Sequence, residues 1–522
     1  MRRHLAAVLA AACALLVAQL VVTASRPEPD VEPGILTPPS PHEPSINGPA
    51  VYGVRPGRPF LFRIAATGDR PMRFVARNLP AGLRLDPSSG IISGTITSRD
   101  VKAYAVSLSA TNARGSAERA FRIVVGDTLA LTPPMGWNDW YTFYEHPSDV
   151  LMRKAADIIV QSGMADHGYQ YVNIDDSWMG KAGAAEPELQ GPARDERGMI
   201  NPNKRFPDMK GMTAYIHGLG LKAGIYTSPG PQTCAGFYGA YQHEALDLAR
   251  FVEWGFDFLK YDWCSYGDVA PKGSAPEPER LQKPYRMMGK LVAEQPRDIV
   301  FNLCQYGMGE VWTWGGEVGG HSWRTTGDLG LEKDSRLPGF YSVGFKNAEH
   351  AEYARPGRWN DPDYILIGYV GNAHSINDPP RPTTLTPHEQ YSYMSMWALM
   401  AAPLFYSGDI TRLDPFTLNV LCNAEVIAID QDVLGRQARI VRKTDDEFVL
   451  AKALEDGSLA VGLFNLSETR RRVSVTMSEL GISKEQRVRD VWRWKDVGKF
   501  LDTYGAEVGR HGVALVRMWP VQ

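Results

Sequence analysis

The chain has 522 residues, 44% of them hydrophobic and 22% charged, which is typical of a folded globular protein and excludes a disordered or fibrous one. The chain has 56 basic and 59 acidic residues. It therefore lacks the excess of positive charge that would predict nucleic-acid binding. At ~150 residues per domain, this length predicts three to four domains, or two if one is a large barrel. The 13 Trp and 22 Tyr exceed what a core of this size needs, and sugar-binding clefts use such rings.

Residues 1–25 predict a secretory signal. Arg2 and Arg3 precede an apolar run over residues 5–22, which ends in small residues before the polar stretch SRPEPD. This pattern is typical of a signal cleaved near Ala24. A retained membrane anchor is the alternative, because the run is close to the ~20 residues that a span requires. We therefore expect a periplasmic or extracellular protein without stable membrane insertion after cleavage. A proline-rich, semi-rigid linker follows over residues 26–45.

Short alternating runs over residues 46–127 predict a half-buried antiparallel β-sandwich. PFLFRIAA, AYAVSLSAT and RAFRIVV are separated by turn clusters such as DPSSG and NARG. The phrase LPAGLRLDPSSGIISGTIT resembles the Ig-like modules that are appended to many exported bacterial enzymes. The resemblance implies a spacer or accessory domain without catalytic residues.

Residues 128–435 alternate between strand-like and helical segments. Eight strand candidates lie near Trp137, Val172, Gly224, Leu259, Phe301, Trp323, Ile365 and Leu404. Ser148 and Thr386 are placed to cap helices. Roughly 300 residues of this alternation predict an α/β fold, a (β/α)8 TIM barrel, with a doubly wound sheet as the alternative. Residues 436–522 return to strands around an Asp-Gly hairpin turn and predict a C-terminal antiparallel β-sandwich.

Polar side chains follow five of the strand candidates in this region. Asp175 and Asp176 follow YVNI, Lys260 and Asp262 follow FDFL, Gln305 follows IVFNLC, Arg324 and Asp328 follow HSW, and Asp361 and Asp363 follow the short strand at Trp359. In a barrel these strand ends meet at one rim, where such enzymes carry their active sites. A single carboxylate there is more often a helix cap or an ion-pair member. Charged or polar groups at five strand ends favour a catalytic site.

No motif for a metal or a nucleotide accompanies these carboxylates. The 11 histidines include no HExxH motif, and the cysteines are not clustered as zinc requires. The glycine run over residues 218–224 ends a helix and begins a strand, the reverse of the order in dinucleotide-binding loops. We therefore expect no metal and no cofactor. Carboxylates beside aromatic rings favour two-carboxylate glycoside hydrolysis.

Eight sequence blocks carry a resemblance to a known family. They are TPPMGWNDW (132–140), YVNIDDSW (171–178), KAGIYTSPG (222–230), TCAGF (233–237), LKYDWC (259–264), SWRTTGD (322–328), RWNDPDYI (358–365) and WALMAAPLFYSGD (397–409). In this order they resemble glycoside hydrolase family 27, the α-galactosidases of clan D. The resemblance implies a barrel followed by a β-sandwich, and a retaining exo-enzyme that hydrolyses terminal α-D-galactosyl residues of oligo- or polysaccharides.

Several alternatives stay open within and outside that family. An α-N-acetylgalactosaminidase, a β-L-arabinopyranosidase or an isomalto-dextranase would share the same blocks. A non-catalytic carbohydrate-binding protein on a decayed barrel is the alternative from another class. The intact Asp262, Asp328 and Lys260 argue against that last interpretation. Linkage preference, aglycone and oligomeric state do not follow from the sequence.

The resemblance also implies roles for individual residues. Asp262 matches the nucleophile and Asp328 the general acid/base of a retaining mechanism, which needs two carboxyl groups ~5–5.5 Å apart. Lys260, two residues earlier on the same strand, is expected to hold Asp262 ionised and to bind substrate by donating hydrogen bonds to ring hydroxyls. The substrate-binding residues that the family implies are Trp140 under the sugar ring, Asp175 and Asp176 at O4 and O6, Arg324 at O2, and Tyr226 and Asp363 at other lining positions.

The cysteines divide into three groups. Cys13 lies within the signal, and the pairing of the other four does not follow from spacing alone. Cys234 and Cys264 match a family disulfide beside the nucleophile. Cys304 and Cys422 are expected to be reduced and buried.

The block after the fifth strand departs from the family pattern. α-Galactosidases commonly read C-E-W here, with the glutamate at O2 of the sugar, whereas this chain continues from Cys304 with Gln305, Tyr306, Gly307 and Met308. Gln305 can still hydrogen-bond O2, but Gln305 and Met308 are not the small residues that accommodate a 2-acetamido group. Because the chain has both Asp175 and Asp176, a sugar with an O6 group is favoured over an arabinopyranoside.

Overall fold

The computed structural model describes residues 30–330, 336–371 and 379–521. The predicted signal peptide lies outside these residues. Within them, no helix combines the length and the apolar composition that are needed to cross a membrane.

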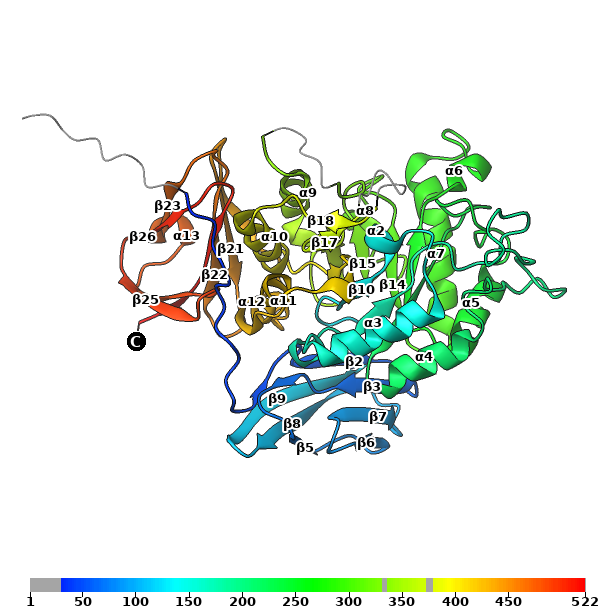
Figure 1. Cartoon of the computed structure of the whole chain (residues 1–522), viewed down its shortest axis with the longest axis horizontal. Helices are drawn as coiled ribbons and strands as arrows, with labels where there is room; N and C mark the ends of the chain where they lie inside the picture. The colour runs from blue at the N-terminus through cyan, green and yellow to red at the C-terminus, as the bar shows by residue number, and fades with distance from the viewer. Residues whose placement is uncertain (1–29, 331–335, 372–378, 522) are drawn as a thin grey trace, which may run out of the picture. The chain divides into compact units, whose positions relative to one another are not determined.

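Eight parallel strands form the central sheet, which confirms the predicted barrel (Figure 1). In chain order they are β10 (Met135–Asn138), β11 (Tyr171–Asn173), β12 (Lys222–Thr227), β13 (Phe258–Asp262), β14 (Val300–Cys304), β15 (Ser322–Arg324), β16 (Trp359–Asp361) and β19 (Leu404–Tyr406). Each strand from β10 to β16 pairs with the next, and β19 pairs with β10. Ile365, just beyond β16, forms a parallel bridge with Tyr406 and brings the two edges together.

The seventh strand of the barrel does not lie where the apolar run predicts it. We expected a strand near Ile365, but the paired strand is β16, which ends at Asp361. Asp363 follows with a φ of 83°, a left-handed conformation that interrupts a strand. Ile365 therefore keeps only the isolated bridge to β19 although it is fully buried.

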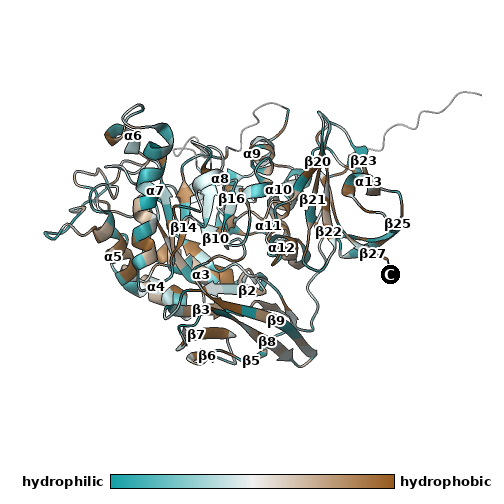
Figure 2. Ribbon diagram, turned by 180° about the vertical axis from the view of Figure 1, so that it is seen from behind, coloured by the Kyte–Doolittle hydropathy of each residue, from teal (hydrophilic) through white to brown (hydrophobic). Residues whose placement is uncertain are grey.

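Helices cover the outside of the barrel strands. They are α2 (Trp140–Phe143), α3 (Asp149–Gln161), α4 (Met209–Gly218), α5 (Glu244–Trp254), α6 (Tyr266–Val269), α7 (Glu277–Glu294), α8 (Val311–Trp314), α9 (Gly339–Ala348), α10 (Pro387–Leu399), α11 (Pro415–Leu421) and α12 (Ala424–Asp430). Both predicted caps form: the Ser148 hydroxyl accepts from Leu151 N–H, and Thr386 and Glu389 make a capping box. Figure 2 shows helices such as α5 with a hydrophobic and a hydrophilic side, as a surface helix requires.

Two β domains flank the barrel in sequence. The Ig-like module consists of two sheets packed against each other. In spatial order, the first contains β2 (Val51–Val54), β9 (Gly115–Val125), β8 (Lys102–Asn112) and β5 (Arg73–Arg77), and the second contains β3 (Pro59–Arg63), β7 (Ile91–Thr95) and β6 (Leu83–Leu85). Its sheets are antiparallel as predicted, except that β2 pairs with β9 in parallel. The C-terminal sheet is β20 (Arg439–Lys443), β21 (Glu447–Ala453), β22 (Leu459–Asn465), β27 (Val513–Pro520), β24 (Gln486–Asp490), β25 (Lys495–Phe500), with β23 (Arg471–Thr476) and β26 (Thr503–Val508) as a second pair. Each module has its own apolar core.

The Ig-like module is hydrogen-bonded to the barrel at the end where the strands begin. Arg55, between β2 and β3, forms an ion pair of 2.6 Å with Asp298 and donates to main-chain carbonyls at the end of α7. The Tyr52 hydroxyl contacts Lys222, the first residue of β12. The part of the linker that is described is also fixed, because Thr37 exchanges hydrogen bonds with Asn419 of α11. The module is therefore bound to the base of the barrel, opposite the strand ends that carry the predicted site.

Candidate active site

Asp262 lies at the carboxyl end of β13 and is almost fully buried. Its Oδ1 atom accepts from the Tyr306 hydroxyl at 2.5 Å and from the Trp263 N–H at 2.8 Å, and Oδ2 accepts from the Tyr226 hydroxyl at 3.2 Å. Burial raises the pKa of Asp262, while the charge of Lys260 and the hydrogen bond from Tyr306 counteract this effect. The carboxyl group is therefore buried and accepts hydrogen bonds from three donors.

Lys260 reaches across the barrel to Asp175 and does not pair directly with Asp262. Its Nζ lies 2.7 Å from Asp175 Oδ2, which also accepts from Asn138 Nδ2 at 2.9 Å and from the Tyr364 hydroxyl at 3.2 Å. Burial is the largest effect and would lower the pKa of Lys260, but Asp175, Tyr364 and the other acidic neighbours together outweigh it and the pKa is raised. The charge of Lys260 lowers the pKa of Asp262 from a distance, whereas its direct ion pair is with Asp175.

Asp176 is held by the loop that follows β12. Its Oδ1 accepts from Ser177 N–H at 2.7 Å and its Oδ2 from Ala235 N–H at 2.9 Å, next to Cys234. Burial raises the pKa of Asp176 to about 7, although these backbone hydrogen bonds oppose the shift. Asp139 accepts a hydrogen bond from the Asp175 N–H at 2.7 Å. Burial raises the pKa of Asp139 well above its usual value.

Arg324, at the end of β15, joins two of the predicted carboxylates. Its Nη2 lies 3.0 Å from Asp363 Oδ2 and 3.3 Å from Asp328 Oδ1. Asp363 is buried and accepts the Tyr141 hydroxyl at 2.6 Å, whereas the Asp328 side chain is 48% exposed. The charge of Asp328 raises the pKa of Asp262, so the two candidate catalytic carboxyl groups are close enough to interact.

Gln305 and Trp140 complete the predicted set. Gln305 is fully buried after β14, its Nε2 donates to the Met308 carbonyl at 2.8 Å, and its Oε1 has no partner among the described residues. Trp140 begins α2 and is partly buried, and its N–H donates to Asn138, which in turn binds Asp175. Trp137, by contrast, is a core residue with no exposed surface.

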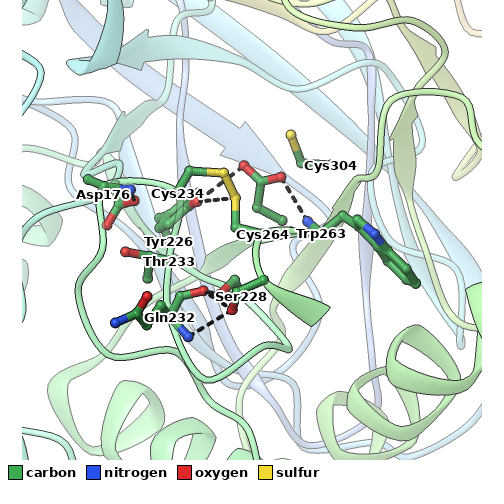
Figure 3. The surroundings of a disulfide bond; sticks show 12 residues. Asp176, Tyr226, Ser228, Gln232, Thr233, Cys234, Trp263, Cys264 and Cys304 are labelled. Atoms are coloured by element: carbon green, nitrogen blue, oxygen red, sulfur yellow. Dashed lines mark hydrogen bonds between the residues drawn. A yellow bond between two sulfur atoms is a disulfide. The ribbon is translucent and has the colours of Figure 1, made fainter. Parts of the chain in front are cut away.

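The predicted disulfide between Cys234 and Cys264 is present and lies beside Tyr226 (Figure 3). The Tyr226 hydroxyl is 3.5 Å from the Cys264 sulfur. Cys304 is a buried free thiol as predicted, but Cys422 is only partly buried. One group of potential metal ligands occurs in the described ranges, namely Cys234, Asp262 and Cys264. Because its two sulfurs are joined to each other, this group cannot bind a metal as thiolates.

The fold thus gathers the predicted site residues at one rim of the barrel, linked by the hydrogen bonds and ion pairs above. The residues that sequence reasoning missed are Asn138, Asp139, Tyr141, Tyr306 and Tyr364, each hydrogen-bonded to a predicted site residue. Asn138 ends β10 and Asp139 follows it, within the GWNDW block, and each tyrosine directly follows a predicted site residue, so position along the chain was the available signal. Which carboxylate each tyrosine contacts depends on segments distant in sequence, which no local pattern reveals.

The barrel carries one buried and one half-exposed carboxylate, together with a lysine and an arginine, at the carboxyl ends of its strands. This combination is that of a glycoside hydrolase. The family model "Alpha galactosidase A" matches residues 132–432, "Alpha galactosidase C-terminal beta sandwich domain" matches 444–518, and "Putative Ig domain" matches 43–126. The chain therefore belongs to glycoside hydrolase family 27, the α-galactosidase family.

Relatives with known names agree with this family. The α-galactosidase of Cyamopsis tetragonoloba is 35% identical over 78% of this chain and 92% of its own length. A Bacteroides fragilis structure named "putative alpha-galactosidase/melibiase" matches with a TM-score of 0.82 and 34% identity, covering 93% of this chain and 98% of that one. A family 27 β-L-arabinopyranosidase from Geobacillus stearothermophilus matches with a TM-score of 0.66 and 25% identity, over 75% of this chain and 98% of its own.

Proposed function

We propose that the chain is a retaining exo-α-galactosidase that removes terminal α-D-galactosyl residues from oligo- or polysaccharides. The observation that carries the proposal is the unequal pair of carboxylates at the end of β13 and in the loop after β15. Asp262 is buried and fixed by three donors, as a nucleophile must be, while Asp328 is half exposed, as a group that exchanges protons with aglycone and water must be.

In the proposed reaction, a carboxylate oxygen of Asp262 attacks C1 of the sugar. Asp328 transfers its proton to the glycosidic oxygen, and the aglycone leaves as an alcohol. In the second step Asp328 removes a proton from water, the water oxygen attacks C1, and the ester bond to Asp262 breaks. The product is galactose in the α configuration, and both carboxyl groups return to their starting states.

The sugar is assigned from the groups around the nucleophile. Asp175 and Asp176 would bind the axial O4 and the O6 of galactose, with Lys260 fixed against Asp175 at 2.7 Å. Arg324 and Gln305 would lie at O2, and Trp140 under the apolar face of the ring. An arabinopyranoside has no O6, so it would leave Asp176 without a partner hydroxyl. Gln305 and Met308 occupy the edge where a 2-acetamido group would need space.

A panel of p-nitrophenyl glycosides tests this assignment. We expect the purified protein to cleave the α-D-galactoside faster than the N-acetyl-α-D-galactosaminide and the β-L-arabinopyranoside, and to leave dextran intact. Proton NMR should detect the α anomer first, and Asp262→Asn should be inactive on every substrate. A faster reaction on another glycoside would replace the sugar assignment, and an initial β product would exclude the retaining mechanism.

We also infer that the protein is exported through the signal over residues 1–25. The Cys234–Cys264 disulfide supports this, because disulfides persist in oxidising compartments outside the cytoplasm. N-terminal sequencing of the mature protein tests the inference, and a chain that begins at Met1 in the cytoplasmic fraction would contradict it.

A further inference from the structure

The two carboxylate oxygens of Asp262 are held unequally. Oδ1 accepts two hydrogen bonds, from Tyr306 at 2.5 Å and Trp263 at 2.8 Å. Across the part of the chain that the structure covers, Oδ2 accepts one longer hydrogen bond, from Tyr226 at 3.2 Å. A carboxylate oxygen that attacks a sugar must present a free lone pair, so Oδ2 is the oxygen available for attack and Oδ1 the oxygen that is fixed.

Tyr306 is itself held firmly in an uncommon conformation. Its φ of 65° lies in the left-handed region, and the following Gly307 has a φ of 82° and so little space that a Cβ there would collide with the Thr325 carbonyl. The Tyr306 hydroxyl lies 3.6 Å from the Cys234 sulfur, and the Arg324 guanidinium lies 5.9 Å from the tyrosine ring centre. Such a backbone conformation persists where the surroundings impose it, and it often occurs at functional sites.

We propose that Tyr306 is a positioning residue for the nucleophile: its hydroxyl fixes Oδ1 of Asp262 and so directs Oδ2 toward the anomeric carbon. The inference rests on the proposed role of Asp262. In the glycosyl-enzyme, the same hydroxyl would donate to the carbonyl oxygen of the ester, and it would stabilise the negative charge that returns to Asp262 on hydrolysis. The family commonly has tryptophan at this position, which has no hydroxyl, so the resemblance does not imply this role.

Charged and titratable groups face Asp262 from several elements. They are Lys260 on β13, Asp175 after β11, Tyr226 on β12, Cys304 on β14, Asp328 after β15 and Tyr285 on α7. Burial, Asp328 and Asp175 raise the pKa of Asp262, whereas Lys260 and the hydrogen bond from Tyr306 lower it. Removing the Tyr306 hydroxyl therefore removes one of the two effects that lower the pKa of Asp262. The pKa rises, and Asp262 is protonated at a higher pH.

The pH profile of kcat/KM for Tyr306→Phe tests the role. The substitution removes one oxygen, and we expect the acidic limb of the profile to move to higher pH by about one pH unit, the order expected for one hydrogen bond to a charged acceptor. The basic limb should stay in place. Tyr306→Trp also lacks the hydroxyl and should shift the acidic limb in the same direction, which keeps the test available if one variant does not fold.

Tyr285→Phe is the matched control. Tyr285 is buried beside the Trp263 ring, and its hydroxyl has no hydrogen-bond partner in the described ranges, so the acidic limb should not move. An unmoved limb in folded Tyr306→Phe would overturn the inference while the proposed function stands. If the wild type cleaves no α-galactoside, or if Asp262→Asn keeps wild-type activity, the proposed function fails and this inference fails with it.

Discussion

Asp328 differs from the other site carboxylates in its access to solvent. Its side chain is 48% exposed, and within the described part of the chain it is held at one side, by the Arg324 guanidinium at 3.3 Å. Asp262, Asp175, Asp176 and Asp363 are all buried and held by several donors. A group that gives a proton to one molecule and takes a proton from another must be reachable by both, which is why the acid/base assignment falls on Asp328.

Asp328→Ala should affect substrates according to their leaving groups. We expect kcat/KM to fall ~10²–10⁴-fold on a galactosyl oligosaccharide, whose aglycone needs a proton to leave. The loss should be much smaller on the 2,4-dinitrophenyl galactoside, whose aglycone leaves without one. Azide should then restore turnover and yield α-galactosyl azide, detected by NMR. Asp262→Ala is the control and should yield the β-azide, while equal losses on both substrates would contradict the role of Asp328.

The carboxylates of the site could be predicted from the sequence, but their partners could not. Asp175, Asp262 and Asp328 follow strand candidates, and the family blocks mark them. Lys260 binds Asp175 directly because of the distance between β11 and β13 in the folded barrel. No local sequence pattern encodes that distance. Tyr306 likewise reaches Asp262 because the chain turns sharply after β14.

At the scale of elements, α7 packs unusually close to the chain between β14 and β15. Gly289 lies in the middle of α7, and a Cβ there would collide with the main-chain carbonyl of Val318. Because β15 carries Arg324 and leads to Asp328, this contact helps to place the acid/base side of the site.

Gly289→Ala should therefore destabilise the protein although alanine favours helices. We expect a loss of about 1–3 kcal/mol in the free energy of unfolding, since a backbone atom must move to admit the methyl group. Gly218→Ala, at the end of α4 with no neighbour within 4 Å, should be neutral or slightly stabilising. Chemical denaturation of both variants checks the comparison, and equal effects would show that α7 has more freedom than its contacts indicate.

Most elements of the barrel could be predicted because local signals agreed with the fold. The capping residues Ser148 and Thr386 begin helices where expected, and seven strand candidates coincide with paired strands. The run at Ile365 could not be predicted correctly, because apolar composition marks burial and not pairing. Asp363 turns the chain with a positive φ, and its side chain is held there by Arg324 and Tyr141, both distant in sequence.

At the scale of the whole molecule, Arg55 is one of the residues through which the Ig-like module contacts the barrel. The last carbonyl groups of a helix lack partners within the helix, and Arg55 donates to those of Val292 and Ala293 at the end of α7. The same side chain pairs with Asp298, which precedes β14. The sequence predicts this module but gives no sign of the contact, since it joins residues far apart in the chain.

Arg55→Ala should weaken the protein and leave its chemistry unchanged. We expect a loss of about 2 kcal/mol or more, since Asp298 and the helix carbonyls lose a charged donor. The kcat/KM value should not change, because the site lies at the other end of the strands. Arg77→Ala breaks an exposed ion pair on the module and is the control. Thermal unfolding measures both, and a wild-type Tm for Arg55→Ala would mean that the module is held in another way.

The Cys234–Cys264 disulfide joins the loop after β12 to the residues that follow β13. The loop contains Ala235, whose N–H holds Asp176, and Asp262 is the last residue of β13, two residues before Cys264. The loop after β12 and the segment that contains Asp262 are therefore ordered by the same bond, and their conformational entropy is lost when the chain folds and the bond forms. That loss is not repeated each time a sugar binds, so the covalent link favours affinity for substrate as well as stability of the fold.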